Sequence, residues 1–322
     1  MLNFCFFKMI KDQLGRTFKT LRISLLSQCN FGCVYCTDDL GSNMSGKNST
    51  LSTDELLGMV QKIHAELNLK SVRLTGGEPL LYPKLEYLIK GLSLIGIEEI
   101  KMTSNGFLLE KKAKLLFDAG LREINISLDA ANPADFFKMT RRDKFEEVKK
   151  GIDAAIKAGI QVKLNTVLMK GKNDHQLIPL LNFAKERGIV IRFLEVMAMG
   201  YLHNKENDFL FSQEEILSTI EKHYKFEALP RKQSATANYW KTTDGAIFGI
   251  IANSSHPFCG DCDRLRLDHE GNIYGCLSVN EPISLIGENA EESYNSKLWE
   301  ALNQKQDVKF TGSKLSMLEI GG

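Results

Sequence analysis

Residues 21–36 read LRISLLSQCNFGCVYC and join a β-rich run to three closely spaced cysteines. Five further β-rich runs follow before residue 197, and each is separated from the next by a segment long enough for a crossover helix. The six runs are Leu21–Leu26, Val72–Thr75, Ile100–Thr103, Ile124–Leu128, Val162–Leu168 and Val190–Val196. This alternation predicts an α/β fold built from six βα units around a parallel sheet.

Capping residues mark the boundaries of the expected helices. Ser52 and Glu55 form a capping-box signature before an apolar stripe at helical spacing. Gly120, Gly159 and Gly188 each follow a periodic segment and precede the next β-rich run, as glycines at helix C-termini do. These signals support the βα assignment independently of the strands.

The chemically unusual residues follow the ends of the predicted strands. They are the cysteines after the first run, Gly76–Pro79 after the second, Ser104–Gly106 after the third, Ser127 and Asp129 at the fourth, and Glu195 and Met197 at the sixth. Active sites of parallel barrels gather at this C-terminal edge. The pattern therefore favours an incomplete (βα)6 TIM-type barrel over an open doubly wound sheet.

The alternation breaks after Gly200. A helix capped by Ser212 and Glu215 is expected there, followed by a cysteine-bearing segment that resembles a hairpin. We therefore expect a partial barrel over residues 1–200 and a C-terminal extension over residues 201–322.

Composition argues against some classes of function. The formal net charge is +1, which disfavours an extended nucleic-acid-binding surface but leaves room for a local basic pocket. No apolar run is long enough to cross a bilayer, and the opening MLNFCFFKMIK has a lysine inside it and no small-residue cleavage site. An odd number of clustered cysteines indicates metal binding in a reducing, cytoplasmic compartment. Cys5, beside three phenylalanines, is expected to be a small buried hydrophobe.

The first cysteine set consists of Cys29, Cys33 and Cys36. Three thiolates can hold three irons of a four-iron cluster and leave the fourth iron open, and an open position is typical of a reactive metal centre. The alternative is a structural zinc knuckle, which needs a fourth ligand. Asp38 and Asp39 are the near candidates, and carboxylates are uncommon in thiolate-rich structural sites.

The Cys-x3-Cys-x2-Cys spacing, with Tyr35 before the last cysteine, resembles the signature of the radical S-adenosylmethionine (radical SAM) superfamily. GGEP at Gly76–Pro79 resembles the glycine-rich motif of that superfamily, although two glycines and a proline also make ordinary turns. The resemblance implies that S-adenosylmethionine binds the open iron and is cleaved to a 5′-deoxyadenosyl radical.

The second cysteine set consists of Cys259, Cys262 and Cys276. Three cysteines again indicate a cluster with one open iron, and a zinc ribbon with His256 or His269 as fourth ligand is the alternative. Arg264 and Arg266 lie between these cysteines, two residues apart. In an extended segment both guanidinium groups face the same side, where they suit phosphate oxygens. In isolation, an exposed strand face with salt bridges is the preferred explanation, but their position beside an open iron favours an anion site.

The chain closely resembles the GTP 3′,8-cyclase (MoaA) family of molybdenum-cofactor biosynthesis. The resemblance runs from DQLGR at Asp12–Arg16 to the terminal EIGG and includes RLR at Arg264–Arg266. It implies two [4Fe–4S] clusters and S-adenosylmethionine as cofactors, GTP as substrate and (8S)-3′,8-cyclo-7,8-dihydroguanosine 5′-triphosphate as product. In that family the purine of GTP binds the open iron of the second cluster, and arginines hold the triphosphate.

The resemblance also implies roles for individual residues. The implied GTP contacts are Arg16, Arg73, Thr103, Lys163, Arg264 and Arg266. The implied S-adenosylmethionine contacts are Tyr35, Gly77, Ser127 and Met197. Gly321 and Gly322 are implied to reach the active site, and Arg264 or Arg266 to supply the final proton. Outside the family context, Thr103, Ser127 and Met197 are equally compatible with packing at strand ends, and Lys163 with a solvated lysine.

Two positions depart from the family pattern. Asp268 stands where threonine is usual, and Thr37-Asp38-Asp39 replaces the common Met-Pro-Glu. Neither change removes a cluster ligand, but the second is expected to alter the loop that covers the cofactor.

Two rival functions remain open at this stage. One is a radical SAM peptide-modifying enzyme with an auxiliary cluster, although such enzymes usually carry more C-terminal cysteines and lack the RLR motif and the Gly-Gly tail. The other is a non-catalytic zinc-binding protein. If the chain is a cyclase, its further expected partners are an electron donor, the next enzyme of the pathway (cyclic pyranopterin monophosphate synthase) and a second copy of the chain in a homodimer.

Overall fold

The computed structural model describes residues 10–38, 51–286, 290–306 and 308–321. The expectations for Cys5, Asp39 and Gly322 therefore fall outside the described residues. Within them, one twelve-stranded sheet has the order β12-β11-β10-β1-β2-β3-β4-β5-β6-β9-β8-β7. The eight strands from β10 to β9 in this order all run parallel, and the antiparallel strands lie at the two ends.

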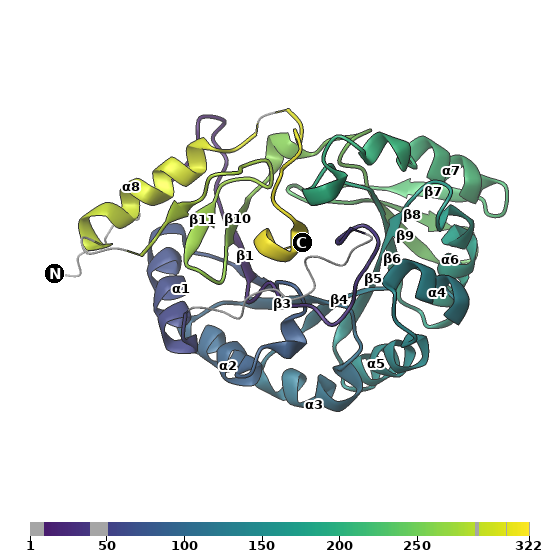
Figure 1. Ribbon diagram of the computed structural model, residues 1–322, viewed down its shortest axis with the longest axis horizontal. Helices are drawn as coiled ribbons and strands as arrows, with labels where there is room; N and C mark the ends of the chain where they lie inside the picture. The colour runs from purple at the N-terminus through teal and green to yellow at the C-terminus, as the bar shows by residue number, and fades with distance from the viewer. Residues whose placement is uncertain (1–9, 39–50, 287–289, 307, 322) are drawn as a thin grey trace.

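The six predicted strands are confirmed, and each matches an observed strand to within two residues. They are β1 (Thr20–Ser24), β2 (Ser71–Thr75), β3 (Glu99–Ser104), β4 (Glu123–Ser127), β5 (Gln161–Leu168) and β6 (Val190–Glu195). The connecting helices are α1 (Thr53–Leu67), α2 (Leu85–Ile95), α3 (Leu109–Ala119), α4 (Pro133–Thr140), α5 (Phe145–Lys157) and α6 (Leu177–Glu186). Figure 1 shows these helices along the outside of the curved sheet.

Both predicted capping boxes are present. Ser52 caps α1 through Glu55, and Ser212 caps α7 (Gln213–Glu221) through Glu215, with both reciprocal hydrogen bonds formed in each case. Such a cap satisfies amide groups that the first helical turn leaves without partners and stabilises a helix by about 1 kcal/mol. Local sequence therefore fixes where these helices begin.

The C-terminal part of the chain extends the same sheet at both ends. The strands β7 (Phe226–Leu229), β8 (Asn238–Thr242) and β9 (Ile247–Ile251) follow β6, and β9 pairs with it in parallel. At the other end β10 (Arg264–Leu267) pairs in parallel with β1 and forms a hairpin with β11 (Asn272–Tyr274), beside β12 (Ile283–Ser284). The ends do not meet, so the barrel is incomplete as predicted; a domain boundary near residue 200 stays a prediction.

The last elements are α8 (Ala290–Asn303) and the short α9 (Met317–Ile320). Figure 1 shows α9, in yellow, inside the ring of strands, while α8 lies on the outside near α1. The helix α9 thus lies inside the barrel. No helix in the described part of the chain combines the length and the apolar character that crossing a membrane requires.

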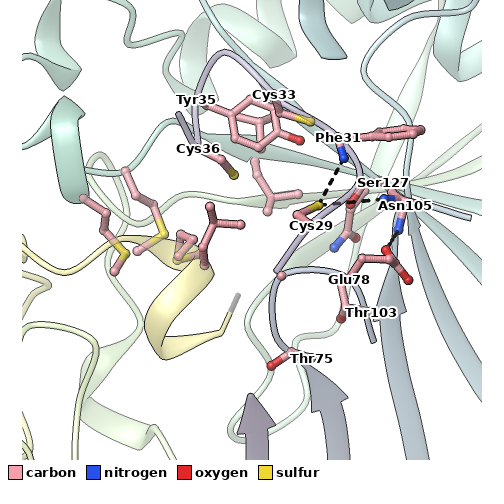
Figure 2. A pocket seen from close by; sticks show the side chains of 18 of the residues that line it. Cys29, Phe31, Cys33, Tyr35, Cys36, Thr75, Glu78, Thr103, Asn105 and Ser127 are labelled. Atoms are coloured by element: carbon pink, nitrogen blue, oxygen red, sulfur yellow. Dashed lines mark hydrogen bonds between the residues drawn. The ribbon is translucent and has the colours of Figure 1, made fainter. Parts of the chain in front are cut away.

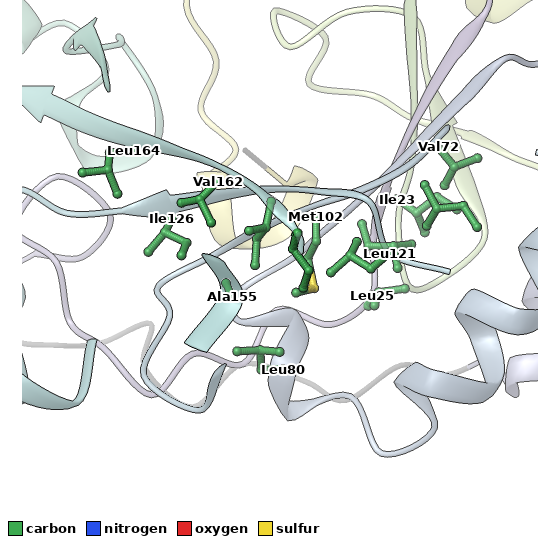
Figure 3. Close-up of a cluster of buried hydrophobic side chains, with 14 of the residues drawn as sticks. Ile23, Leu25, Val72, Leu80, Met102, Leu121, Ile126, Ala155, Val162 and Leu164 are labelled. Atoms are coloured by element: carbon green, nitrogen blue, oxygen red, sulfur yellow. The ribbon is translucent and has the colours of Figure 1, made fainter. Parts of the chain in front are cut away.

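Alternating strand residues face opposite sides of the sheet, and the two sides differ in chemistry. Ile23, Val72, Met102, Ile126 and Leu164 are buried between the strands and the helices (Figure 3). Full burial stabilises the fold by about 1.5–3 kcal/mol for each such side chain. The residues between them in sequence are mostly polar and line a cavity of about 1000 Å³ inside the barrel. Ordinary TIM barrels fill this space with bulky apolar side chains, so the hollow interior indicates a binding chamber.

Candidate active site

The first cysteine set lies in the loop after β1, at the C-terminal edge of the sheet. Cys29, Cys33 and Cys36 all line a cavity of about 180 Å³, which we call the upper cavity, and Figure 2 shows their sulfurs grouped at its wall. Burial raises the pKa of all three thiols, that of Cys29 to about 11, and the neighbouring thiols raise the pKa of Cys33 and Cys36 further. Three buried groups that resist ionisation in the empty protein become thiolates readily when a cation binds them.

No three His, Cys, Asp or Glu side chains among the described residues converge on one point that a single ion can occupy. A single zinc needs its ligands within about 2.3 Å of one centre, whereas a cubane binds each cysteine through a different iron. The donor set of three cysteines without a fourth converging ligand therefore fits an iron–sulfur cluster better than zinc.

The loop that carries these cysteines is held by α4 and β4. The amides of Gly32 and Val34 donate to the carbonyls at the end of α4, Thr140 at 3.1 Å and Met139 at 2.9 Å. The Tyr35 hydroxyl donates to Asp129 at 2.8 Å, and burial raises the pKa of that carboxyl to about 6. The cluster loop is thus fixed by backbone and side-chain contacts before any metal is bound.

The residues expected to bind S-adenosylmethionine meet at this cavity. Tyr35, Gly77, Ser127 and Met197 all line it. Gly77 packs so closely on the first cysteine loop that a Cβ atom there would lie 2.1 Å from the carbonyl oxygen of Gln28. Next to it, Glu78 accepts hydrogen bonds from Ser104 and from the amides of Leu80 and Asn105, and burial raises its pKa to about 7.

The second cysteine set lines the large chamber inside the barrel, which we call the lower cavity. Cys259 and Cys262 precede β10, and Cys276 follows β11, so the hairpin brings the three together. Burial and the neighbouring thiols raise the pKa of Cys259 to about 11. Burial also disfavours the Cys262 thiolate, but Lys305 and Arg264 outweigh this and lower its pKa to about 6.

A row of cations crosses the wall of the lower cavity. Strand register places Arg266, Arg22, Arg73 and Lys101 side by side on β10, β1, β2 and β3. Burial lowers the pKa of Arg22, and the nearby charges of Arg266, Arg264 and Arg73 lower it further. The buried Nε of Arg22 has no hydrogen-bond partner. A buried guanidinium that faces other cations and lacks a partner requires an anion.

Carboxylates neutralise only part of this charge. Glu123 accepts from Arg73 at 2.8 Å and from Lys163 at 2.6 Å, and Glu99 pairs with Lys101 at 2.6 Å. The other cavity cations donate to neutral oxygens: Arg192 to Asn165, Arg264 to the carbonyl of Ser234, and Arg266 to the carbonyl of Gly321. The chamber therefore carries an excess of positive charge suited to a polyanionic ligand.

The two cavities adjoin each other. Thr103, Asn165, Leu194, Met197 and Met317 line both of them. The first and second cysteine sets consequently face two adjoining cavities, with Thr103 between them.

Arg16 and Gly321 are the two expected and described site residues that the linings of the cavities do not include, although Gly321 accepts a hydrogen bond from Arg266 of the lower cavity. The position of Arg16 is set by other contacts. Arg16 forms an ion pair with Asp12 and donates to the carbonyls of Cys259 at 2.8 Å and Gln306 at 3.0 Å. The structure therefore does not bring Arg16 to the chamber, whereas Arg22, which the sequence analysis missed, faces it.

Comparison with known proteins places this site in a family. Residues 23–184 match the family model described as the radical SAM superfamily, and residues 189–313 match Molybdenum Cofactor Synthesis C. The GTP 3′,8-cyclase of Staphylococcus epidermidis is 37% identical over 339 aligned residues, which cover 98% of this chain and 99% of that protein. The GTP 3′,8-cyclase of Staphylococcus aureus is 40% identical over 276 residues, 83% of this chain and 81% of that protein. The chain belongs to the GTP 3′,8-cyclase family.

Solved structures support the fold of this cyclase family member. Streptococcus suis SuiB bound to precursor peptide SuiA superimposes with a TM-score of 0.65 at 16% identity, over 90% of this chain and 67% of that chain. Native anSMEcpe with bound AdoMet gives 0.56 at 17% identity, over 80% and 74%. At such identities the likeness concerns the architecture alone. The cofactors of the cyclase are S-adenosylmethionine and two [4Fe–4S] clusters, as the sequence predicts.

The two departures from the cyclase pattern have local structural explanations. Asp268 is buried at the β10–β11 turn and accepts from the amides of Glu270 and Asn272 and from the Tyr274 hydroxyl. Its side chain therefore stabilises the hairpin that carries the second cysteine set. Thr37 accepts from Arg141 at 3.0 Å, and the same guanidinium donates to the carbonyl of Asp38 at 2.7 Å.

Several residues at the cavity were missed by the sequence analysis. The main ones are Arg22, Glu123, Asn165 and Arg192. Each of them lies on the same face of the sheet as Arg73 or Lys163. Because side chains alternate between the two faces of a strand, polar residues two positions apart in each predicted strand are the signal that would have identified them. Lys305 carries no comparable signal, because it lies beyond the last predicted helix of the extension.

Proposed function

We propose that this chain is a GTP 3′,8-cyclase in which the substrate spans both cavities, with its triphosphate and purine in the lower cavity and its ribose at the junction. The observation that carries the proposal is that the two cavities adjoin, with one cysteine set at each. Before C3′ of the ribose can bond to C8 of guanine, its C3′–H bond must be broken by the 5′-deoxyadenosyl radical formed at the first cysteine set, so the ribose must reach the upper cavity while the purine stays at the second set; Thr103 lies where the two cavities meet.

The cysteine sets hold the cofactors. Cys29, Cys33 and Cys36 would bind the first cluster, and Cys259, Cys262 and Cys276 the second. When bound, the first cluster with S-adenosylmethionine supplies a 5′-deoxyadenosyl radical, and the second supplies an open iron and an electron. The protein surrounds this chemistry with Tyr35, Gly77, Ser127 and Met197 at the upper cavity, which orient S-adenosylmethionine and limit access of water.

The cations of the lower cavity bind the triphosphate. Arg22, Arg192, Arg264 and Arg266 have no carboxylate partner among the interactions of the described residues, so phosphate oxygens can take the place of the neutral acceptors. Glu123 pairs with both Arg73 and Lys163 and so fixes their side chains in the chamber wall, where they complete the triphosphate site.

Arg266 is the better placed of the two proposed proton sources. Burial lowers its pKa to about 10, which brings proton release by its guanidinium closer to neutral pH. Its Nη1 donates to the carbonyl of Gly321, so the C-terminal tail fixes its orientation inside the chamber. Gly321 thus acts through Arg266, and the role of Gly322 stays a prediction.

Further partners follow from family membership alone. We propose an external one-electron donor, cyclic pyranopterin monophosphate synthase as the next enzyme, assembly as a homodimer, and a cytoplasmic location. No feature of the described surface selects among electron donors.

The central experiment is anaerobic reconstitution followed by assays for iron and for 5′-deoxyadenosine. We expect about eight irons per chain, and 5′-deoxyadenosine only when GTP, S-adenosylmethionine and dithionite are all present. Replacement of Cys259, Cys262 and Cys276 by alanine should leave about four irons and abolish cyclisation. Zinc in place of iron, or 5′-deoxyadenosine formation that is indifferent to GTP, would contradict the proposal.

A further inference from the structure

The segment that ends α8 contacts all three parts of the second cysteine set. The side-chain oxygen of Gln304 accepts from the amide of Gly275, which precedes Cys276, at 3.1 Å. Lys305 Nζ lies 3.2 Å from Cys262 Sγ. Arg16 Nη1 donates to the carbonyl of Gln306 and also to the carbonyl of Cys259, and so links the two. Residues 304–306 therefore brace the three cysteines, and Lys305 itself lines the lower cavity.

Lys305 is the charged member of this brace. Only 8% of the residue is exposed, its Nζ also donates to the carbonyl of Arg264, and the ammonium lies 5.3 Å from the ring centroid of Phe18. No carboxylate pairs with it among the described residues. A buried ammonium is costly unless a negative charge lies nearby, and the sulfur of Cys262, which would be a thiolate when it holds the cluster, lies within hydrogen-bond distance.

We propose that Lys305 is a positioning residue of the second cluster, which donates an N–H···S hydrogen bond to Cys262 and offsets part of the negative charge of the bound cluster. The inference rests on the proposed function, because it takes the second cysteine set to hold iron and sulfide. It goes beyond that function by assigning a role in tuning the second cluster to Lys305, which lies beside Cys262 in the lining of the lower cavity.

The physical consequence concerns reduction of the second cluster. The reduced form carries one more negative charge than the oxidised form, so a nearby ammonium stabilises it more strongly. Hydrogen bonds to cluster sulfurs and nearby charges are known determinants of cluster potential. Lys305 should therefore raise the midpoint potential of the second cluster and leave that of the first cluster unchanged.

A packing role makes a different prediction. If Lys305 only fills space beside Phe18, methionine, which has a similar length and no charge, should replace it without effect on the cluster. Arginine keeps the charge and the donor groups but has a different shape. The pair of substitutions Lys305→Met and Lys305→Arg therefore separates charge from packing.

The test is a redox titration of the reconstituted, full-length protein, followed by electron paramagnetic resonance. A variant without the first three cysteines identifies the signal of the second cluster. We expect Lys305→Met to shift the midpoint potential of that signal to a more negative value, Lys305→Arg to retain most of the wild-type value, and the first-cluster signal to stay in place. Lys297→Met, which removes a lysine of α8 that contacts no cysteine, is the matched control and should behave as wild type.

The outcomes separate the inference from the proposed function. An unshifted second-cluster potential in Lys305→Met overturns the inference, and so does an equal shift in both clusters. Failure of Lys305→Met to take up the second cluster while Lys305→Arg takes it up supports a need for charge; failure in both variants points to packing and overturns it. If the wild-type protein binds zinc at this set, the proposed function itself is wrong.

Discussion

At the scale of single residues, the inward-facing arginines determine what the chamber can bind. Arg22 lies in the centre of the cation row and has an unpartnered Nε, whereas Arg16 already has a carboxylate and two carbonyls. We expect Arg22→Met to weaken GTP binding by about tenfold to a hundredfold, because one charge-assisted contact contributes about 1.5–3 kcal/mol. Isothermal titration of GTP against the anaerobic, cluster-loaded protein measures this.

Arg16→Met is the comparison for Arg22→Met, because it also replaces an arginine by methionine. Arg16 contacts the loop of Cys259 from outside the cavity, so this change should reduce retention of the second cluster more than it reduces the affinity of loaded protein for GTP. Iron content after gel filtration reports the first effect. A larger loss of GTP affinity in Arg16→Met than in Arg22→Met would reverse the assignment made from the cavity lining.

Glu123 gives a prediction about pH. Burial alone would raise its pKa, but Arg73 and Lys163 together lower it to about 2, below the ordinary value of 4.5. A carboxyl whose pKa is lower in the folded state stabilises the fold above its unfolded pKa, and this contribution is lost as the pH falls from about 4.5 towards 2. The shift corresponds to on the order of 3 kcal/mol at neutral pH.

Glu123→Gln should therefore lower the free energy of unfolding at pH 7 and flatten its dependence on pH in that acidic window. Urea unfolding of the cluster-free chain at pH 7 and pH 3 measures both effects. Glu99→Gln is the control, because Glu99 forms a comparable pair with Lys101 while 47% of its side chain is exposed, and exposed pairs contribute little. An equal change in the free energy of unfolding of the two variants would show that the buried group of Glu123, Arg73 and Lys163 has no special role in stability.

At the scale of elements, the described C-terminal tail depends on one glycine. The amide of Gly200 donates to the carbonyls of Ser313 and Leu315, both at 3.1 Å. Its φ is +53°, and a Cβ atom there would lie 3.2 Å from Cα of Ser316, the N-cap of α9. Gly200→Ala should therefore displace α9 and expose the end of the chain.

Gly171→Ala is a matched control, because Gly171 also has positive φ, +71°, but its Cβ would meet nothing within 4 Å. Both changes add backbone strain of about 1 kcal/mol. Only Gly200→Ala should accelerate digestion of the tail by carboxypeptidase and reduce cyclase activity. Similar digestion rates for the two variants would mean that the tail is held elsewhere.

Local sequence was sufficient to predict the elements up to β6. The strands have clear β-rich runs, and the capping boxes at Ser52 and Ser212 fix helix starts by short-range hydrogen bonds. The parallel pairing of β9 with β6 and of β10 with β1 was not predicted. The strand β9 forms a hairpin with β8, and β10 forms one with β11. The local sequence of a hairpin strand does not show which distant strand pairs with its other edge.

At the scale of the whole molecule, the cysteine sets and the residues expected at the upper cavity lie together as the family resemblance implies. The motifs placed them because each follows a strand end, and strand ends of a parallel sheet meet at one edge. Arg22 and Arg192 belong to no motif; only the alternation of inward-facing positions along β1 and β6, which places them beside Arg73 and Asn165, identifies them. The motif DQLGR indicates a position of Arg16 in the sequence and not a direction in space, so its contact with GTP stays a prediction.

The junction between the cavities gives the last prediction. Thr103 lines both cavities, and its hydroxyl lies 3.5 Å from Asn125 Nδ2. Thr103→Phe should fill the junction and keep the ribose from the upper cavity, while both cysteine sets stay intact. We expect about eight irons per chain, no more 5′-deoxyadenosine with GTP than without it, and no cyclised product. Thr103→Ser, which adds no volume, should keep the product, and chromatography of the nucleotides with mass detection distinguishes the two. A phenylalanine ring at the junction should leave no passage for the ribose. Normal cyclisation in Thr103→Phe would therefore mean that the ribose reacts somewhere other than the junction.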